Sequence, residues 1–331
     1  MRKVGHLGTL DPMATGVLPL ALGQATRLVD FLKGGRKVYE GTIRLGFSTN
    51  TYDHEGLPAS DVVAPQITQE QLTQQAANML GEQLQVPPAF SAKKVKGIPA
   101  YRLARQGKSV PLAACSVHID ALSFTLSTST TDEVEFTIRC SAGTYVRSVA
   151  HDLGSSLGCG AHLVRLRRTE SGEFSLQQSM SLKDFEPLSI EELTARLIPL
   201  NQVLSEYPAL RVDSETETAI ALGRVFFCKN VQGESHSAGT SWHRVLSSEG
   251  LLIALAKPVV AADASDAHHS SAILWHPTVV LIAKNHSSRL CLLPLPLKIV
   301  GVLVEEKPRM TTRTRTTTRS CSIVERNLFW M

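Results

Sequence analysis

The sequence contains no apolar run near the roughly 18 residues that a membrane-spanning helix needs. Its first residues, MRKVGHLGTLDP, lack the apolar stretch of a secretory signal peptide. Its six cysteines include no CxxC pair, and none lies beside a histidine at zinc-binding spacing. No phosphate-binding P-loop is present either. These absences predict a soluble cytoplasmic protein with reduced thiols, without a membrane partner and without a metal.

Acidic residues are missing from one long segment, residues 83–119, so its positive charges are not balanced within the segment. The whole chain has a formal net charge of only +4, which is compatible with RNA binding without requiring it. The cations of the segment are Lys93, Lys94, Lys96, Arg102, Arg105 and Lys108. A second basic cluster comprises Arg165, Arg167 and Arg168. Both patterns fit a surface that contacts phosphates, and both also fit a solvated basic face without a partner.

Apolar periodicity predicts the main elements. A capping box of Thr68 and Gln71 begins a helix over 67–80, and an apolar stripe at helical spacing predicts another helix over 144–157. Strict alternation predicts a hairpin over 122–140. The expected organisation is a catalytic domain (1–185), a helical linker (186–206), a β-rich domain (207–285) and an atypical, disordered tail (286–331).

Residues 5–28 hold the most unusual segment. Four glycines and two prolines crowd the stretch GHLGTLDPMATGVLPLALGQATRL, which predicts a tight loop rather than a regular element. Asp11 is the only acid between residues 1 and 29. A single carboxylate in such a loop is either a turn-former or an active-site group, and the pattern alone leaves both interpretations open.

This block resembles the signature of the TruB family of tRNA pseudouridine synthases, GH-x-G-[TA]-LDP-x-A-x-GVLP. Three further stretches are similar to family segments and follow in the family's order. They are KVYEGTIRLGFSTNTYDHEG (37–56), QVPPAFSAKKVKGIPAYRLARQGKSV (85–110) and SAGTYVRSVAHDLGSSLGCGAHLVRLRRTESGEF (141–174). The resemblance covers nearly all of residues 5–175. Beyond it, the β-rich region resembles the family's PUA-like RNA-binding domain only loosely.

The resemblance implies a role for each matching residue. Asp11 would be the catalytic aspartate, Tyr39 would stack on a flipped base, and Arg147 would pair with Asp11. The substrate-binding residues implied by the match or by the basic clusters are His6, Tyr145, Leu166, Lys93 and Arg167. The implied fold is α+β, a mixed and mostly antiparallel sheet flanked by helices, with a small β-rich PUA-like domain. The implied enzyme is a monomer that acts on the T-stem-loop of tRNA and needs no cofactor.

The reaction suits these residue types. Pseudouridine formation breaks the N1–C1′ bond, turns the uracil and joins C5 to C1′. Taking the base out of its stack costs a few kcal/mol, of which an aromatic face recovers about 1–3 kcal/mol. A carboxylate then acts as a nucleophile or as a base at C2′, and the sequence does not decide between these routes. An arginine beside it favours the charged carboxylate.

Three departures and two alternatives accompany this assignment. Family members carry a strand and a Lys-Pro-x-Gly loop before the GH-x-G block, whereas Met1 stands four residues before Gly5. We therefore expect an uncovered sheet edge beside the Asp11 loop and lower stability and activity. Ala142 replaces a residue that is often polar, and no resemblance is seen beyond about residue 286. The alternatives are a catalytically silent tRNA-binding protein and a guide-RNA-dependent relative, while Met13 excludes an aspartyl-phosphate enzyme, which needs an acid there.

Overall fold

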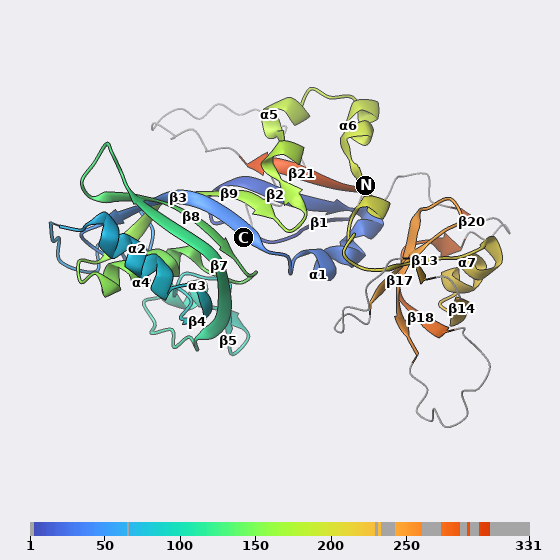
Figure 1. Cartoon of the computed structure of the whole chain (residues 1–331), viewed down its shortest axis with the longest axis horizontal. Helices are drawn as coiled ribbons and strands as arrows, with labels where there is room; N and C mark the ends of the chain where they lie inside the picture. The colour runs from blue at the N-terminus through green and yellow to red at the C-terminus, as the bar shows by residue number, and fades with distance from the viewer. Residues whose placement is uncertain are drawn as a thin grey trace.

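A computed structural model describes residues 3–64, 66–228, 231–232, 242–259, 273–284, 290–291 and 298–304 of the chain. Two sheets dominate it (Figure 1), a larger one built mainly from the first 175 residues and a smaller one built from later residues. No helix in these ranges is long and apolar enough to cross a membrane. The chain therefore combines sheets and helices in the α+β manner that the sequence predicts.

The larger sheet has eleven strands within the described ranges, and its main path runs β11-β21-β2-β9-β3-β8-β7-β4. Its strands are β1 (Val4–His6), β2 (Thr15–Leu22), β3 (Lys37–Leu45), β4 (Gly81–Gln85), β7 (Cys115–Leu126), β8 (Glu133–Cys140), β9 (Ala161–Ser171), β10 (Phe174–Ser175), β11 (Met180–Ser181), β12 (Ile198–Pro199) and β21 (Lys298–Val304). Among the pairs described, β2–β9 and β11–β21 are parallel, and the others are antiparallel. The prediction of a mixed, mostly antiparallel sheet is confirmed.

The helices are α1 (Val29–Leu32), α2 (Gln69–Asn78), α3 (Ala100–Ala104), α4 (Val146–Ser156), α5 (Leu182–Phe185), α6 (Ile190–Arg196) and α7 (Ser214–Ala221), with 3-10 turns η1 (Gly23–Leu28), η2 (Leu176–Gln178) and η3 (Leu200–Gln202). The helices α2 and α4 pack against the larger sheet in one apolar core, whereas α7 packs against the smaller sheet described below. The predicted capping box at the start of α2 is present, since Thr68 accepts from the Gln71 amide and Gln71 from the Thr68 amide. Local capping thus fixes where α2 begins.

The stripe predicted for α4 faces the sheet. Val146, Val149 and Leu153 of this helix are buried in one core with Ile43 of β3 and Leu163 of β9. Fully burying one such side chain stabilises the fold by about 1.5–3 kcal/mol. The helix is therefore held rigidly across β9, which matters because it also carries Arg147.

The smaller sheet runs β14-β18-β17-β16-β13-β15 and lies within the region for which a β-rich domain is predicted. Its strands are β13 (Ala209–Arg211), β14 (Phe226–Cys228), β15 (Val231–Gln232), β16 (His243–Leu246), β17 (Leu252–Pro258) and β18 (Ile273–Val280). Outside both sheets, β5 (Lys94–Val95) pairs with β6 (Ile98–Pro99), and β19 (Ala283–Lys284) pairs with β20 (Leu290–Cys291). The smaller sheet also has its own apolar residues, which form a core around Trp275 and Ile220. Leu252 and Leu255 of β17 instead share a core with Leu7 and Leu28 near the start of the chain.

The strand β21 departs from expectation. We expected a disordered tail from residue 286, but residues 298–304 form a strand paired with β2 over Gly16–Ala21. Figure 1 shows this strand, in red, beside the blue strand β2. We expected an uncovered sheet edge beside the Asp11 loop, but β2, the strand that follows this loop, is paired with β21. The reason is visible in the sequence KIVGVLV, a short apolar run rich in β-branched residues that suits a strand with neighbours on both edges.

Candidate active site

Asp11 lies in the turn between β1 and β2. Its main-chain carbonyl accepts a hydrogen bond from the Ala14 amide at 2.9 Å, so the main chain closes the turn. Its carboxylate oxygens accept hydrogen bonds from Arg147 and remain 35% exposed with the rest of the side chain. The loop therefore forms a turn and also presents an oriented carboxylate that solvent can reach.

Arg147 is the second residue of α4, and its side chain is only 7% exposed. Its Nε lies 2.8 Å from Oδ2 of Asp11, and its Nη2 lies 3.1 Å from Oδ1. The other donors reach the main-chain carbonyls of Thr51, at 3.1 Å, and Phe90, at 3.2 Å. Such a forked contact fixes both the direction and the distance of the carboxylate. The predicted pairing of Arg147 with Asp11 is thus present.

The start of α4 is held by an amide side chain from β4. Gln85 accepts a hydrogen bond from the Tyr145 amide at 2.7 Å and donates one to the Tyr145 carbonyl at 3.1 Å. Gln85 is buried, whereas the Tyr145 side chain is half-buried. This clamp sets the position of the first helical turn and therefore that of Arg147.

A second carboxylate, Asp53, was missed by the sequence analysis. It is nearly buried and lies with Oδ2 3.5 Å from Nη1 of Arg147. The Thr51 hydroxyl, at 2.6 Å, and the Glu55 amide, at 3.1 Å, donate to its other oxygen. Asp53 stands inside the stretch TYDHEG that resembles a family segment, and this is the signal that could have found it. One guanidinium is therefore shared between two carboxylates.

Tyr39 and Leu166 provide an aromatic and an apolar surface on neighbouring strands. In the register of β3 and β9, Tyr39 lies opposite Arg168 and Gly41 opposite Leu166, so Tyr39 and Leu166 share one face of the sheet. Leu10 and Met13, which flank Asp11, pack in the same core cluster as both. Burial raises the pKa of the Tyr39 phenol, and the charge of Arg168 opposes part of this rise. Tyr39 is therefore a neutral phenol at pH 7.

Arg168 corrects one expectation. We interpreted its cluster with Arg165 and Arg167 as a phosphate-contacting surface or a solvated basic face, but Arg168 is only 1% exposed and fits neither interpretation. It donates hydrogen bonds to the carbonyls of Val17, at 2.8 Å, Thr9, at 3.1 Å, and Gly8, at 3.1 Å. These carbonyls lie on both sides of Asp11, so Arg168 ties the two ends of the Asp11 loop together. Its inward direction follows from strand alternation, which places it on the face of Leu166.

The approach of β2 to β9 at this point depends on Gly16. This residue has a φ of 104°, and a Cβ there would lie 2.1 Å from the Arg168 carbonyl oxygen. Any other residue would push the two strands apart and with them the end of the Asp11 loop. The glycine of the sequence motif therefore has a direct steric reason.

His6 lies at the end of β1, directly before the loop. Its Nδ1 accepts a hydrogen bond from the Gly8 amide at 3.3 Å. Burial lowers the pKa of His6, and the nearby charge of Arg168 lowers it further. The half-buried ring is therefore neutral at pH 7 and helps to shape the loop whatever else it contacts.

Arg167 is not brought to the site. Strand alternation places it and Arg165 on the face of β9 opposite to Leu166 and Arg168. Arg165 contacts Glu135 at 3.1 Å, and Arg167 lies 3.9 Å from Glu40. The substrate-binding role predicted for Arg167 therefore has no geometric support at Asp11.

Lys93 belongs to the basic segment of residues 83–119. This segment touches the site at Phe90, whose carbonyl accepts a hydrogen bond from Arg147. The exposed Lys93 ammonium donates a hydrogen bond to the Cys115 sulfur at 3.0 Å, and this contact raises the pKa of Lys93. Farther along, Arg102 and Arg105 lie over the ring of Tyr101, with 6.0 and 5.5 Å between guanidinium carbon and ring centre. These three cations are exposed, and the segment that carries them contacts Arg147 through Phe90.

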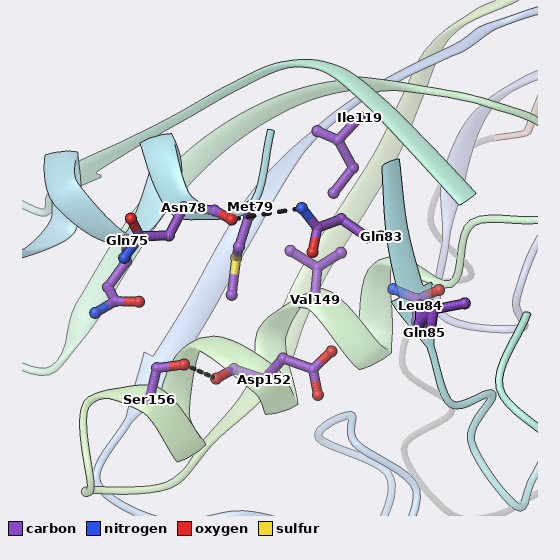
Figure 2. A pocket seen from close by; sticks show the side chains of 10 residues that line it. All are labelled: Gln75, Asn78, Met79, Gln83, Leu84, Gln85, Ile119, Val149, Asp152 and Ser156. Carbon is purple, nitrogen blue, oxygen red and sulfur yellow. Dashed lines mark hydrogen bonds between the residues drawn. The ribbon is translucent and has the colours of Figure 1, made fainter. Parts of the chain in front are cut away.

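A separate cavity of about 300 Å³ lies between α2, β4 and α4 (Figure 2). It is lined by Gln75, Asn78, Met79, Gln83, Leu84, Gln85, Ile119, Val149, Asp152 and Ser156. At 100° per residue, Val149, Asp152 and Ser156 lie on the side of the helix opposite to Arg147. The hollow therefore does not contain Asp11, and its link to the site is Gln85, which lines the cavity and also clamps Tyr145.

Comparison with known proteins identifies the group to which this chain is similar. The family model described as "TruB family pseudouridylate synthase (N terminal domain)" matches residues 1–146, and "tRNA pseudouridylate synthase B C-terminal domain" matches residues 147–205. A protein of Solibacter usitatus named tRNA pseudouridine synthase B is 43% identical over 85% of this chain and 90% of its own length. The protein of the same name from Opitutus terrae is 43% identical over 61% of this chain and 83% of its own length.

Solved structures share the fold at lower identity. A chain of a Cbf5-Nop10-Gar1 complex superposes with a TM-score of 0.62, at 22% identity, over 86% of this chain and 78% of that chain. A chain of the archaeal box H/ACA sRNP Nop10-Cbf5 complex gives a TM-score of 0.61, at 21% identity, over 88% and 81%. At this identity the likeness shows the fold alone, and it confirms the predicted α+β class.

Proposed function

Because the chain belongs to the TruB family of pseudouridylate synthases, we propose that it isomerises the T-loop uridine at position 55 of tRNA to pseudouridine. The observation that carries this proposal is the forked contact of Arg147 with the partly exposed carboxylate of Asp11. A buried cation fixes a carboxylate that faces solvent, and this arrangement suits a carboxylate that must reach the sugar or the uracil of a substrate. The other named residues lie on the elements that flank this pair.

Asp11 is the catalytic carboxylate in this proposal, and it acts as a nucleophile or as a base at C2′. The N1–C1′ bond breaks, the uracil turns, C5 joins C1′, C5 loses its proton and N1 gains one. Arg147 holds the carboxylate by its forked contact and directs it at the ribose. The second carboxylate, Asp53, holds Arg147 from its other side.

Tyr39 and Leu166 receive the flipped base. Extrusion costs a few kcal/mol, and stacking on the Tyr39 ring returns about 1–3 kcal/mol. Because its phenol is neutral at pH 7, Tyr39 can relay a proton near C5 by passing on its own hydrogen as it accepts another, so that no charge remains in the apolar setting. Leu166 shares this face and excludes water from the base.

Binding of the T-stem-loop is assigned to the exposed cations and to the half-buried residues beside the loop. Lys93 contacts phosphates, and His6 and Tyr145 contact the RNA close to Asp11. The smaller sheet, within the proposed PUA-like domain of residues 207–285, extends the RNA contact away from the catalytic domain of residues 1–185. The monomeric state and the cytoplasmic location stay predictions.

The test is tritium release from C5-labelled uridine in a T-stem-loop RNA, with the parent chain and with Asp11→Asn. The proposal expects release by the parent and none by the variant, while both bind the RNA with similar Kd. Asp30→Asn is the matched control, because Asp30 is exposed on α1, and it should release tritium like the parent. Binding without release by the parent would support the catalytically silent tRNA-binding alternative instead.

A further inference from the structure

The strand β21 lies near one end of the larger sheet, between β2 and the short strands β11 and β12, although it comes from the far end of the described chain. One edge pairs with β2, from Gly16 opposite Val304 to Ala21 opposite Ile299. Its other edge pairs with β11 in parallel and with β12 in antiparallel orientation. Among the described strands, β21 is the one that joins β11 and β12 to the rest of the sheet.

The ladder between β2 and β21 accommodates a proline without losing a hydrogen bond. The Leu7 amide donates to the Pro19 carbonyl, so the main-chain polar groups of Pro19 point towards β1 and away from β21. Pro19 and Gly301 therefore form a non-hydrogen-bonded pair, in which the Cα atoms approach to about 4.5 Å. Leu18 and Leu20 then direct their amides and carbonyls at β21. Proline lacks an amide hydrogen, and here that hydrogen would have pointed towards β1, which has already ended at His6.

The strand β2 is also the element that leads directly out of the Asp11 loop. On its other edge β9 pairs only with Thr15 and Gly16, and β1 pairs only with Leu20 to Leu22. The β21 ladder is thus the longest continuous support of β2 within the described residues. Without it, the main-chain groups of a strand that is mostly buried would lack partners along one edge.

We propose that residues 298–304 are a strand donated from the C-terminal part of the chain to the catalytic sheet, and that its seating holds the Asp11 loop in its working position. The occupant is this chain's own segment, because its apolar, β-branched sequence matches a site with neighbours on both edges. The effect on the Asp11 loop is measured by tritium release and rests on the proposed function. The pairing of β21 with β2 is measured by disulfide trapping and does not.

The pairing is tested by disulfide trapping in the full chain with Ala21→Cys and Ile299→Cys. These positions are opposite in register and form a non-hydrogen-bonded pair, a spacing that a disulfide can bridge. The matched control combines Ala21→Cys with Val300→Cys, since a shift by one residue places the second cysteine on the other face. Mass spectrometry under oxidising conditions should find the intramolecular link in the first pair and not in the second.

Two results would overturn the proposal. A link in neither pair, or equally in both, would mean that the strand does not hold this register. A link found only between two chains would mean that a second copy supplies the strand.

The effect on the Asp11 loop is tested with Val302→Pro in the full chain. Residue 302 directs its amide at Leu18, so proline removes a ladder donor and displaces β2. We expect tritium release to fall by about 100-fold, the size that a misplacement of about 1 Å produces. The oxidised Ala21→Cys/Ile299→Cys chain should release tritium like its reduced form, which shows that a fixed strand is compatible with turnover.

A folded Val302→Pro chain with parental activity would overturn this part of the proposal, and so would loss of activity on closing the disulfide. If the parent itself releases no tritium, the proposed function fails while the trapping result still decides the pairing.

Discussion

Arg147 and Asp53 face each other at 3.5 Å, and both side chains are less than 10% exposed. This ion pair lies behind the contact of the same guanidinium with Asp11. A buried arginine with a carboxylate on each side has little freedom to rotate, because every rotation gives up a charge-assisted hydrogen bond. The pair therefore braces the guanidinium that holds the Asp11 carboxylate.

Replacing Asp53 should loosen this brace without removing the catalytic acid. Asp53→Asn keeps the size of the side chain and an acceptor for the Thr51 hydroxyl, but it removes the charge facing Nη1. We expect kcat to fall by about tenfold, which is a loss of about 1.4 kcal/mol of transition-state stabilisation. The Kd for the T-stem-loop should stay within about twofold in a filter-binding assay, since Asp53 is not exposed to RNA. Asp61→Asn, at an exposed position, is the control, and an unchanged kcat for Asp53→Asn would contradict the brace.

Removing Arg168 should destabilise the whole fold. Arg168→Met leaves the carbonyls of Gly8, Thr9 and Val17 without their donor in a buried place. We expect the free energy of unfolding to fall by about 3–5 kcal/mol in urea titrations. Arg167→Met, one residue away on the exposed face, should change it by less than about 0.5 kcal/mol. Equal effects of the two substitutions would show that Arg168 does not tie the loop.

Lys37 predicts a dependence of stability on alkaline pH. Burial lowers the pKa of Lys37 from 10.5 to about 8, and the charge of Arg168 adds to this. Between pH 8 and 10.5 the unfolded chain holds a proton on Lys37 that the folded chain has released, so stability rises with pH across this window. Below pH 8 the folded protein must carry the buried charge and this gain is lost.

The measurement for Lys37 compares the parent with Lys37→Met. The variant avoids the buried charge, which raises the free energy of unfolding. It also leaves the Lys33 carbonyl without its donor, which lowers the free energy of unfolding by about 1 kcal/mol. We expect Lys37→Met to be more stable by about 1–2 kcal/mol at pH 7, with the difference shrinking as the pH rises towards 10.5. A difference that does not change with pH would contradict the assignment to Lys37.

Lys93 predicts a change in the salt dependence of RNA binding. If Lys93 neutralises one phosphate, Lys93→Ala should lower the slope of log Kd against log salt concentration by about 0.7–0.9. Lys183→Ala, on an exposed position of α5, should leave the slope unchanged. Titrations of the T-stem-loop at several salt concentrations measure both. An equal slope for parent and Lys93→Ala would place Lys93 outside the RNA contact.

Much of the fold and site could be predicted from the sequence because the causes are local. The capping residues Thr68 and Gln71 start α2, and the stripe of α4 faces the core, as their spacing predicts. The glycine-rich motif around Asp11 indicated a tight loop, and the resemblance paired Asp11 with Arg147, a contact that the structure contains. The capping box, the stripe and the loop depend on residues within a few positions of one another, whereas the Asp11–Arg147 contact joins residues 136 positions apart and was expected from the resemblance alone.

The tertiary structure decided what depends on register and on distant partners. Arg167 and Arg168 are neighbours of the same type, and only the register of β9 against β3 turns one outward and the other under the Asp11 loop. Asp53 acquires its importance only when α4 brings Arg147 to it. The apolar run of residues 298–304 becomes part of the catalytic sheet only because β2 offers an edge that its sequence fits. Residue types and local periodicity thus set the elements and the tight loop that carries Asp11, whereas long-range pairing determined which charges are buried and which strand pairs with β2 behind that loop.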